Sequence, residues 1–362
     1  MANKTARLGD LATYINGYAF KPADWGDTGL PIIRIQDLTG NSYQLNRYDG
    51  EYPERIEVND GDVLISWSAS LGVYVWQRGK ALLNQHIFKV VFDKLPVNKE
   101  YFVFAVEHKL AEMESKTHGA TMKHIVKKDF DGTTIPYPPI EKQAEIADHL
   151  RRITSLIDRQ TEQLLLLDQL VKSRFIELFG DPMTDVSKWS ASTIGEQFNV
   201  SSGGTPATGE KAYWENGTIP WIGSNMCQDT MLSENDGKFI TEEGYAHSSA
   251  KWFHKGTVLV ALVGATIGKT ALLRFDTTTN QNIAAIDVTQ NAAFSSEFVF
   301  YHMQMLYSKF MEIGSGKFKM ANQGFIRQLP LICPPIELQE QFAAFVEQTD
   351  KSKLCGRMEA AA

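Results

Sequence analysis

The sequence predicts an α+β protein made of two similar domains joined by a long, coiled-coil-like helix. The first observation is an internal repeat: between residues 72–143 and 268–339, 15 of 72 positions are identical without a gap. The second is a segment, residues 141–179, that contains neither Gly nor Pro and carries apolar residues alternately four and three apart. A chain of 362 residues is long enough for each copy to bury its own core.

The identities of the repeat fall in clusters, which predicts one domain fold used twice. Upstream of the gap-free part the register drifts through short insertions, but short matching runs continue. The clusters are Asn84-Gln85 with Asn280-Gln281, 102–104 with 298–300, the Pro-Pro-Ile-Glu-x-Gln run of 138–143 with 334–339, and Leu8-Gly9-Asp10 with Ile194-Gly195-Glu196.

Each copy shows the same order of expected elements: short strands, one helix, a basic loop, and then a Pro-Pro pair before a long helix. Short apolar runs bounded by turn residues predict the strands, and apolar residues at helical spacing predict the helix. The expected strands are 63–67 with 258–263 and 87–92 with 283–288, and the expected helices are 101–113 and 297–311.

The long helix has clear start and stop signals. Pro139 precedes it, Glu141 lies in its first turn, and Gly180-Asp181-Pro182 ends it. At 1.5 Å per residue it would extend roughly 60 Å, which suits a spacer. The alternative is a core helix of one large globule, because Leu156, Leu165, Leu166 and Leu170 widen its apolar face. The seam positions expected to dock a partner are Ile146, Leu150, Ile153, Ile157, Leu164, Leu167, Val171 and Leu178.

The second long helix is expected to be shortened, because only 26 residues remain from Glu337. This leaves the Leu-rich face of residues 150–171 short of a partner within the chain, so either self-association or dependence on partner subunits for solubility is expected. The predicted organisation is a first domain at 1–139, a spacer helix at 140–180, a second domain at 181–335 and a shortened helix at 336–362.

Composition and charge exclude several classes of protein. The chain has 36 basic and 43 acidic residues, a net charge of -7, which argues against a general polyanion binder and requires any nucleic-acid site to be local. Three cysteines are too few for a disulfide framework. No run approaches the ~18 to 20 apolar residues of a membrane span, and no signal-peptide pattern opens the chain. A cytoplasmic location is therefore expected.

Motifs for catalysis are weak. Residues 264–270, Gly-Ala-Thr-Ile-Gly-Lys-Thr, resemble a phosphate-binding loop but have three residues, not four, between Gly264 and the Gly-Lys pair. A nucleotide-hydrolysing enzyme built on this loop stays open as an alternative. The sequence has no Cys-x-x-Cys, His-Glu-x-x-His or Gly-x-Ser-x-Gly motif. We expect no metal site, no catalytic residue and no cofactor in this chain.

A basic loop with turn residues occurs at the same place in each copy. Lys and Arg neutralise phosphates, whereas Arg, Asn and Gln can read base edges, so these loops are the candidate DNA contacts. A tandem protein-binding scaffold without DNA is a further alternative. The candidates are Lys116, Lys123, Lys127 and Lys128 in the first copy and Lys317, Lys319, Asn322 and Arg327 in the second. Two further pairs follow corresponding apolar runs: Arg34 and Gln36, and Ser224 and Asn225.

The sequence resembles the specificity subunit of type I restriction–modification enzymes along nearly its whole length, to about Lys351. The repeated clusters, the Gly203-Gly204-Thr205-Pro206 turn and the Ile219-Pro220-Trp221-Ile222 run carry the resemblance. It implies two target-recognition domains, each reading one half of a bipartite asymmetric site in double-stranded DNA. It also implies that the helices dock two modification subunits, and that S-adenosylmethionine and ATP are bound by the modification and restriction subunits.

Overall fold

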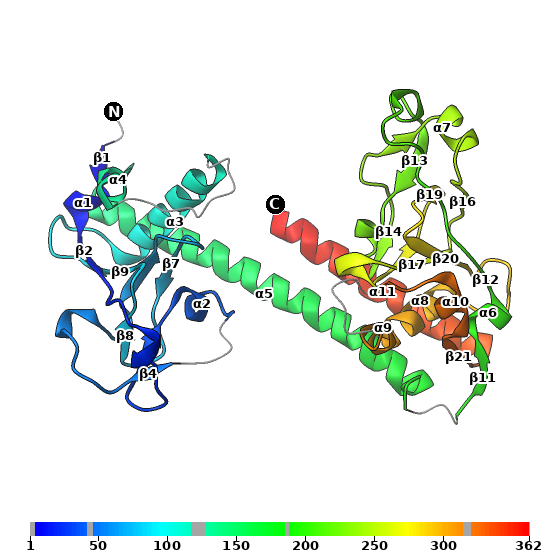
Figure 1. Ribbon diagram of the computed structural model, residues 1–362, viewed down its shortest axis with the longest axis horizontal. Coiled ribbons are helices and arrows are strands. Elements are labelled where there is room, and N and C mark those ends of the chain that lie inside the picture. The colour runs from blue at the N-terminus through cyan, green and yellow to red at the C-terminus, as the bar shows by residue number, and fades with distance from the viewer. Residues whose placement is uncertain (1–3, 42–45, 117–126, 185–187, 314–319, 362) are drawn as a thin grey trace. The chain divides into compact units, whose positions relative to one another are not determined.

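The computed structural model describes residues 4–41, 46–116, 127–184, 188–313 and 320–361. The chain divides into two compact units, residues 1–157 and 158–362, and a continuous helix, α5 (Ile140–Phe179), passes from one to the other (Figure 1).

The first unit contains two four-stranded sheets and a two-stranded ribbon. One sheet has the strand order β2-β9-β6-β7 and is antiparallel throughout; the other has the order β4-β3-β8-β5, with β3 and β8 parallel. Strand β1 pairs with β10. The elements are β1 (Thr5–Arg7), α1 (Leu8–Leu11), β2 (Thr13–Asn16), η1 (Pro22–Asp24), β3 (Leu30–Ile33), α2 (Ile35–Leu38), β4 (Arg47–Tyr48), η2 (Glu54–Ile56), β5 (Glu57–Val58), β6 (Val63–Ser66), β7 (Gly72–Val75), β8 (Ala81–Leu83), β9 (Ile87–Val91), α3 (Lys99–Lys116), α4 (Lys127–Gly132) and β10 (Thr134–Pro136).

The second unit repeats this plan. Its sheets have the orders β12-β20-β17-β18-β14 and β15-β13-β19-β16, with β13 and β19 parallel, and β11 pairs with β21. The elements are β11 (Ser190–Thr193), α6 (Ile194–Gln197), β12 (Asn199–Ser201), η3 (Lys211–Tyr213), β13 (Ile219–Ile222), η4 (Ser224–Met226), β14 (Thr230–Leu232), β15 (Phe239–Ile240), α7 (Glu242–Ala246), β16 (Trp252–Phe253), β17 (Val258–Ala261), η5 (Gly264–Thr266), β18 (Thr270–Leu273), β19 (Thr277–Thr279), β20 (Ile283–Asp287), α8 (Ser296–Met305), α9 (Tyr307–Met311), α10 (Gln323–Gln328), β21 (Pro330–Cys333) and α11 (Ile336–Ala361).

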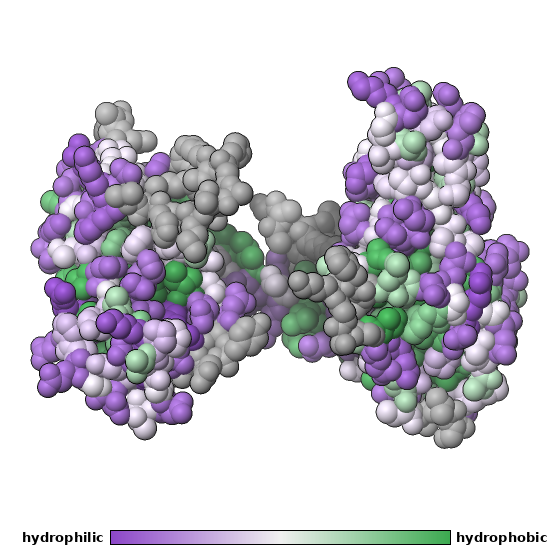
Figure 2. All heavy atoms as spheres, viewed as in Figure 1, coloured by the Kyte–Doolittle hydropathy of each residue, from purple (hydrophilic) through white to green (hydrophobic). Residues whose placement is uncertain are grey.

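The shared strand order confirms that the chain is one α+β fold used twice. Equivalent strands even keep their pairing register: Tyr14 of β2 lies opposite Val90 of β9, and Val200 of β12 lies opposite Ile286 of β20. In the second unit the part around α7 and β13 presents mostly hydrophilic residues, whereas apolar residues gather over α8 and its neighbours (Figure 2).

A buried glutamine fixes the start of each long helix. Gln143 Oε1 accepts from the Asn98 backbone N–H at 2.9 Å, and its Nε2 donates to the Pro138 carbonyl at 2.8 Å. Gln339 Oε1 accepts from the Ser295 N–H at 2.9 Å, and its Nε2 donates to the Pro334 and Ala293 carbonyls. Both side chains are fully buried. The repeated Pro-Pro-Ile-Glu-x-Gln run is therefore a structural joint between helix and domain.

Helix α5 confirms the expected uninterrupted helix, and α11 confirms the shortened second one, with 26 residues against 40. Within the second unit the two helices pack together with α8 (Figure 1), and Lys353 of α11 pairs with Asp168 of α5 at 2.7 Å. Val171, Phe175 and Phe179 of α5 are buried there with Phe342 and Val346.

The seam of α5 is covered unevenly. Val171 is buried, and Ile146, Leu150, Leu164, Leu167 and Leu178 are half-buried, but Ile153 and Ile157 are 54% and 52% exposed. The four leucines that widen the face, Leu156, Leu165, Leu166 and Leu170, are 49–57% exposed. Together these residues form an exposed apolar face on α5. No helix within the described ranges is long and apolar enough to cross a membrane.

Several elements were not expected from the sequence. Between the basic loop and the Pro-Pro pair, each unit inserts a short helix and a strand, α4 with β10 and α10 with β21. Helices α1 and α6 were also missed. All four helices have six residues or fewer, too short to show helical periodicity.

Candidate nucleic-acid interface

The repeated Asn-Gln pair lies where two sheets of the first unit meet. Strands β3 and β8 are parallel, so their carboxyl ends share one edge, and the Asn84 N–H donates to the Ile33 carbonyl at 3.2 Å. The chain end of β2 reaches the same place, since the Tyr18 N–H donates to the Leu83 carbonyl and the Gln85 N–H donates to the Tyr18 carbonyl. We call residues 84–86 and 280–282 the Asn-Gln corners.

The second corner repeats two of these backbone connections. The Asn280 N–H donates to the Ile222 carbonyl at 3.1 Å, and the Gly204 N–H donates to the Thr279 carbonyl at 2.8 Å. A Cβ atom at Gly203 would collide with the Thr279 carbonyl, as one at Gly17 would collide with the Asn84 carbonyl. Glycine is required at both places because the two chain segments touch through their backbones.

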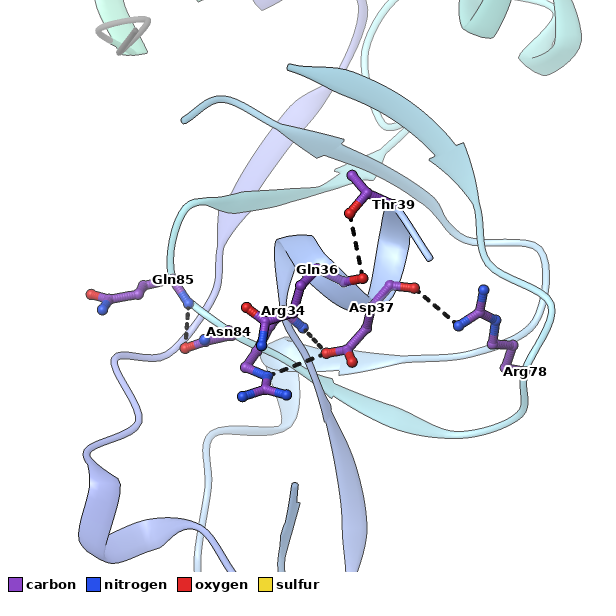
Figure 3. Close-up of polar contacts among 7 residues, drawn as sticks. All are labelled: Arg34, Gln36, Asp37, Thr39, Arg78, Asn84 and Gln85. Carbon is purple, nitrogen blue, oxygen red and sulfur yellow. Dashed lines mark hydrogen bonds and ion pairs between the residues drawn. The ribbon is translucent and has the colours of Figure 1, made fainter. Parts of the chain in front are cut away.

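The asparagine and the glutamine of each pair have different roles. Asn84 Oδ1 accepts from the Gln85 N–H, and Asn280 Oδ1 accepts from the Asn282 N–H, so both asparagines shape the turn. The glutamines are exposed. Gln85 points away from the Arg34–Asp37 cluster (Figure 3), and Gln281 accepts from the Thr205 hydroxyl at 2.6 Å.

A hollow of about 410 Å³ opens beside the second corner. Polar side chains lie among apolar ones in its lining: Gln323 Nε2 donates to Ser202 Oγ at 3.0 Å, and Gln281, Asn282 and Lys251 lie around them. The amide, hydroxyl and ammonium groups of these side chains supply both hydrogen-bond donors and acceptors. Contacts to base edges and phosphates require both kinds of group. Its lining residues are Ser202, Gly203, Ser249, Lys251, Leu262, Val263, Gln281, Asn282, Met320, Ala321, Asn322 and Gln323.

The first unit places different side chains at the equivalent positions. Asn16, at the end of β2, is exposed, and its Oδ1 accepts from Trp67 Nε1 at 3.4 Å. The Trp67 ring also contacts His86 and stacks on Phe88. Lys127 lies over the Phe88 ring at 5.9 Å. The first corner is therefore aromatic and basic where the second is rich in amides.

Arg34 and Gln36 lie beside the first corner, at the turn from β3 into α2 (Figure 3). The Arg34 side chain is only 13% exposed, pairs with Asp37 at 3.4 Å and lies over the Trp25 ring. Asp37 is buried, and its Oδ2 also accepts from the Arg34 N–H at 2.8 Å. The Arg34 side chain therefore stabilises the turn itself, whereas the Gln36 side chain is exposed to solvent.

Ser224 and Asn225 lie at the equivalent turn, from β13 into η4. Asn225 is exposed, and the Ser224 carbonyl accepts from Thr266 Oγ1 at 3.2 Å. The two turns correspond, as expected.

On α10, Asn322 and Arg327 make contacts within the second unit. Asn322 caps the helix by accepting from the Phe325 N–H. Arg327 donates to the Val200 carbonyl at 2.5 Å and to Gln323 Oε1 at 3.1 Å. These contacts hold α10 against the end of β12, next to the hollow.

The basic-loop lysines are only partly described. Lys127 and Lys128 are exposed at the start of α4, and Lys127 pairs with Asp131 at 2.8 Å. Lys116 ends α3, with its side chain outside the described part of the chain. Lys123, Lys317 and Lys319 also lie outside the described residues.

The Gly264–Thr270 segment forms a turn between strands. It continues into strand β18 instead of opening a helix, and Lys269 pairs with Asp229 at 2.6 Å. This hydrogen bond is the main cause that raises the Lys269 pKa. Ala69 has φ 60° and Gly264 has φ 75° in equivalent turns of the two units, and the first turn has no lysine. The nucleotide-binding alternative is therefore not favoured.

Sequence reasoning missed Asn16, Trp67, His86, Ser202 and Lys251 as corner residues. They come from segments far apart in the chain and meet only through strand pairing. The signal that could have found them is the Asn-Gln identity itself, repeated at 196 residues in an otherwise divergent stretch.

The family model "Type I restriction modification DNA specificity domain" matches residues 2–167 and 186–355, once for each unit. The chain belongs to this family. It is 29% identical over 168 residues to the type I restriction enzyme EcoBI specificity subunit of Escherichia coli, an alignment that covers 46% of this chain and 35% of that relative. It is 26% identical over 197 residues to the MjaVIII specificity subunit of Methanocaldococcus jannaschii, covering 53% and 45%.

The crystal structure of the type I restriction-modification system S subunit from M. genitalium has a similar fold. The comparison gives a TM-score of 0.58 at 15% identity and covers 99% of this chain and 92% of that one. In sequence, the chain matches between a third and a half of the length of the curated relatives named above.

Proposed function

We propose that the chain is the DNA sequence-recognition subunit of a type I restriction–modification complex, in which each unit reads one half of a bipartite, asymmetric site in double-stranded DNA. The observation that carries the proposal is the duplicated Asn-Gln corner: one backbone frame, used twice in one chain, presents different side chains in each copy. A reader of two different half-sites needs this combination.

The subunit acts without catalytic groups of its own in this proposal. S-adenosylmethionine is bound by two modification subunits and ATP by restriction subunits, which carry out methyl transfer and cleavage. Helices α5 and α11 dock the modification subunits, and the exposed leucines of α5 support this role because an apolar helix face of that extent favours a protein partner. Association of two copies of this chain through the same face is the competing outcome.

We further propose that α5 sets the spacing between the half-sites. A continuous helix of 40 residues extends about 60 Å, and both its ends continue directly into a domain. The domain limits suggested by the sequence, with a spacer at 140–180, remain predictions.

The test is an exchange of the second unit. The complex is reconstituted with a modification subunit, and its methylated DNA sites are profiled for the wild-type chain and for a chain whose residues 195–335 come from a relative. We expect a bipartite motif of which only one half changes. The matched control, an exchange of residues 9–139, changes only the other half. Absence of a bipartite motif, or a change in both halves after one exchange, contradicts the proposal and favours a protein-binding scaffold.

A further inference from the structure

The exposed and half-buried positions around the two Asn-Gln corners divide into those that are the same in both units and those that differ. Gln85 and Gln281 are the same. The pairs that differ, matched by strand register and by the 196-residue repeat, are Asn16 with Ser202, His86 with Asn282, and Lys127 with Gln323. Two backbone connections that hold these positions recur in both units: Asn84 to Ile33 with Asn280 to Ile222, and Tyr18 to Leu83 with Gly204 to Thr279.

The two shared glutamines make little contact with the fold: Gln281 accepts one hydrogen bond, from the Thr205 hydroxyl. Gln85 is exposed, and no side-chain hydrogen bond joins it to the residues the structure describes. The neighbouring asparagines alone provide the turn's internal hydrogen bonds. The two domains would recognise different DNA sequences, and what two different half-sites share is the sugar–phosphate backbone. A side chain that is the same in both domains therefore fits a contact to that backbone.

The divergent positions have the opposite character. Asn16 is exposed with both amide N–H groups available, since the Trp67 indole uses only its oxygen. At the equivalent position Ser202 receives a hydrogen bond from Gln323, and both line the hollow with Asn282. Donors and acceptors at these places differ between the units, as contacts to different base edges require.

Resting on the proposed function, we infer that Gln85 and Gln281 contact the DNA backbone and position each domain, whereas the pairs Asn16/Ser202, His86/Asn282 and Lys127/Gln323 determine which bases are read. Asn16 and Ser202 are the most direct test of base reading. Both side chains are small and polar, neither belongs to a buried core, and they stand at equivalent places: Asn16 ends β2 and Ser202 directly follows β12.

The experiment selects duplexes from a randomised 30-base-pair pool with the full chain in complex with its modification subunits, followed by sequencing and by titration of the selected duplex. We expect Asn16→Ser to change base preference by about 5-fold or more at one position of one half-site, and Ser202→Asn to do so in the other half. We expect Gln85→Ala and Gln281→Ala to weaken binding roughly tenfold to every duplex, with the motif unchanged. The controls Gln77→Ala and Gln290→Ala, exposed glutamines at the opposite sheet ends, change neither.

The outcomes separate the two levels of the argument. If the wild type selects a bipartite motif but Asn16→Ser and Ser202→Asn leave it unchanged, the assignment of base readers is wrong while the proposed function stands. If Gln85→Ala or Gln281→Ala alters base identity, or leaves affinity unchanged, the assignment of backbone contacts is wrong. If the wild type selects no motif, the proposed function fails and this inference with it.

Discussion

Gln339 gives a sharp test of the joint between domain and helix. Replacing it by leucine keeps most of the side-chain volume but removes three hydrogen bonds in a fully buried place. The Ser295 N–H and the buried Pro334 carbonyl would be left without a partner, whereas the Ala293 carbonyl belongs to an exposed residue and can turn to water. At ~1 to 3 kcal/mol for each stranded group, the second unit should lose about 3 kcal/mol of stability. For a unit of this size that lowers the melting temperature by about 6 to 12 °C.

Calorimetry measures the loss of stability, and hydrogen exchange shows which elements of the chain lose it. Peptides from α8 should lose protection in Gln339→Leu, while peptides from α3 keep it. Gln143→Leu should give the reverse, since it strands the Asn98 N–H and the Pro138 carbonyl of the first unit. Gln348→Leu, an exposed site on α11, is the matched control and should change stability by less than about 0.5 kcal/mol. A loss in Gln339→Leu no larger than in this control would refute the reasoning.

Three further predictions concern the second unit and the long helix. Burial lowers the pKa of His302 from 6.5 to about 4, against a hydrogen bond to the Pro330 carbonyl. The folded state is therefore fully stable with respect to His302 above pH 6.5, and about 3 kcal/mol of the free energy of unfolding is lost as the pH falls towards 4. In urea unfolding, His302→Gln should show a weaker dependence of stability on pH than the wild type. Lys269→Ala should leave ATP binding at background in calorimetric titration, as in the wild type; saturable ATP binding that the variant abolishes would restore the nucleotide alternative. Leu166→Glu with Leu170→Glu should abolish assembly with modification subunits in light scattering, whereas Gln169→Glu on the same helix assembles normally.

The repeated architecture could be predicted because its signals are local. Apolar runs such as 63–67 and 258–263 mark strands in both copies, and the gap-free register carries the order of elements from one copy to the other. The absence of Gly and Pro between 141 and 179 located α5 almost to the residue. Local composition and spacing decide these features, and a sequence shows both directly.

The faces of α5 could not be predicted in the same way. The apolar seam expected from the four-and-three spacing includes position 174, which is an arginine, and does not include Phe175 or Phe179. Both phenylalanines are nevertheless fully buried. They pack on Phe298 of α8, so the end of α5 is buried by the domain and not by a helix alone. The spacing of apolar residues predicts that a helix has an apolar face. Which residues of the helix are buried depends on the elements that pack against it.

The site was harder to predict because it depends on long-range pairing. Charge and sequence position indicate Lys127 and Arg34 as DNA contacts, but neither shows that Arg34 pairs with the buried Asp37. Asn16 and Trp67 are 51 residues apart and meet through β9, which lies between their strands. An exposed polar residue at a strand end has no signature of its own, so it becomes a candidate only when the partner strand is known.

The corners also show how recognition can change without loss of the fold. Their shape is held by backbone hydrogen bonds, such as Asn84 N–H to the Ile33 carbonyl, and by glycines at the two close approaches. Exposed side chains outside this frame contribute little to stability, so a substitution at an exposed position such as Asn16 should cost less than about 0.5 kcal/mol. The residues that hold the corner are thus different from those that would set base preference. This explains why the two copies share the same frame although only 15 of 72 residues are identical in the gap-free region. Stability depends on the backbone of the corner, and base preference is left free to diverge.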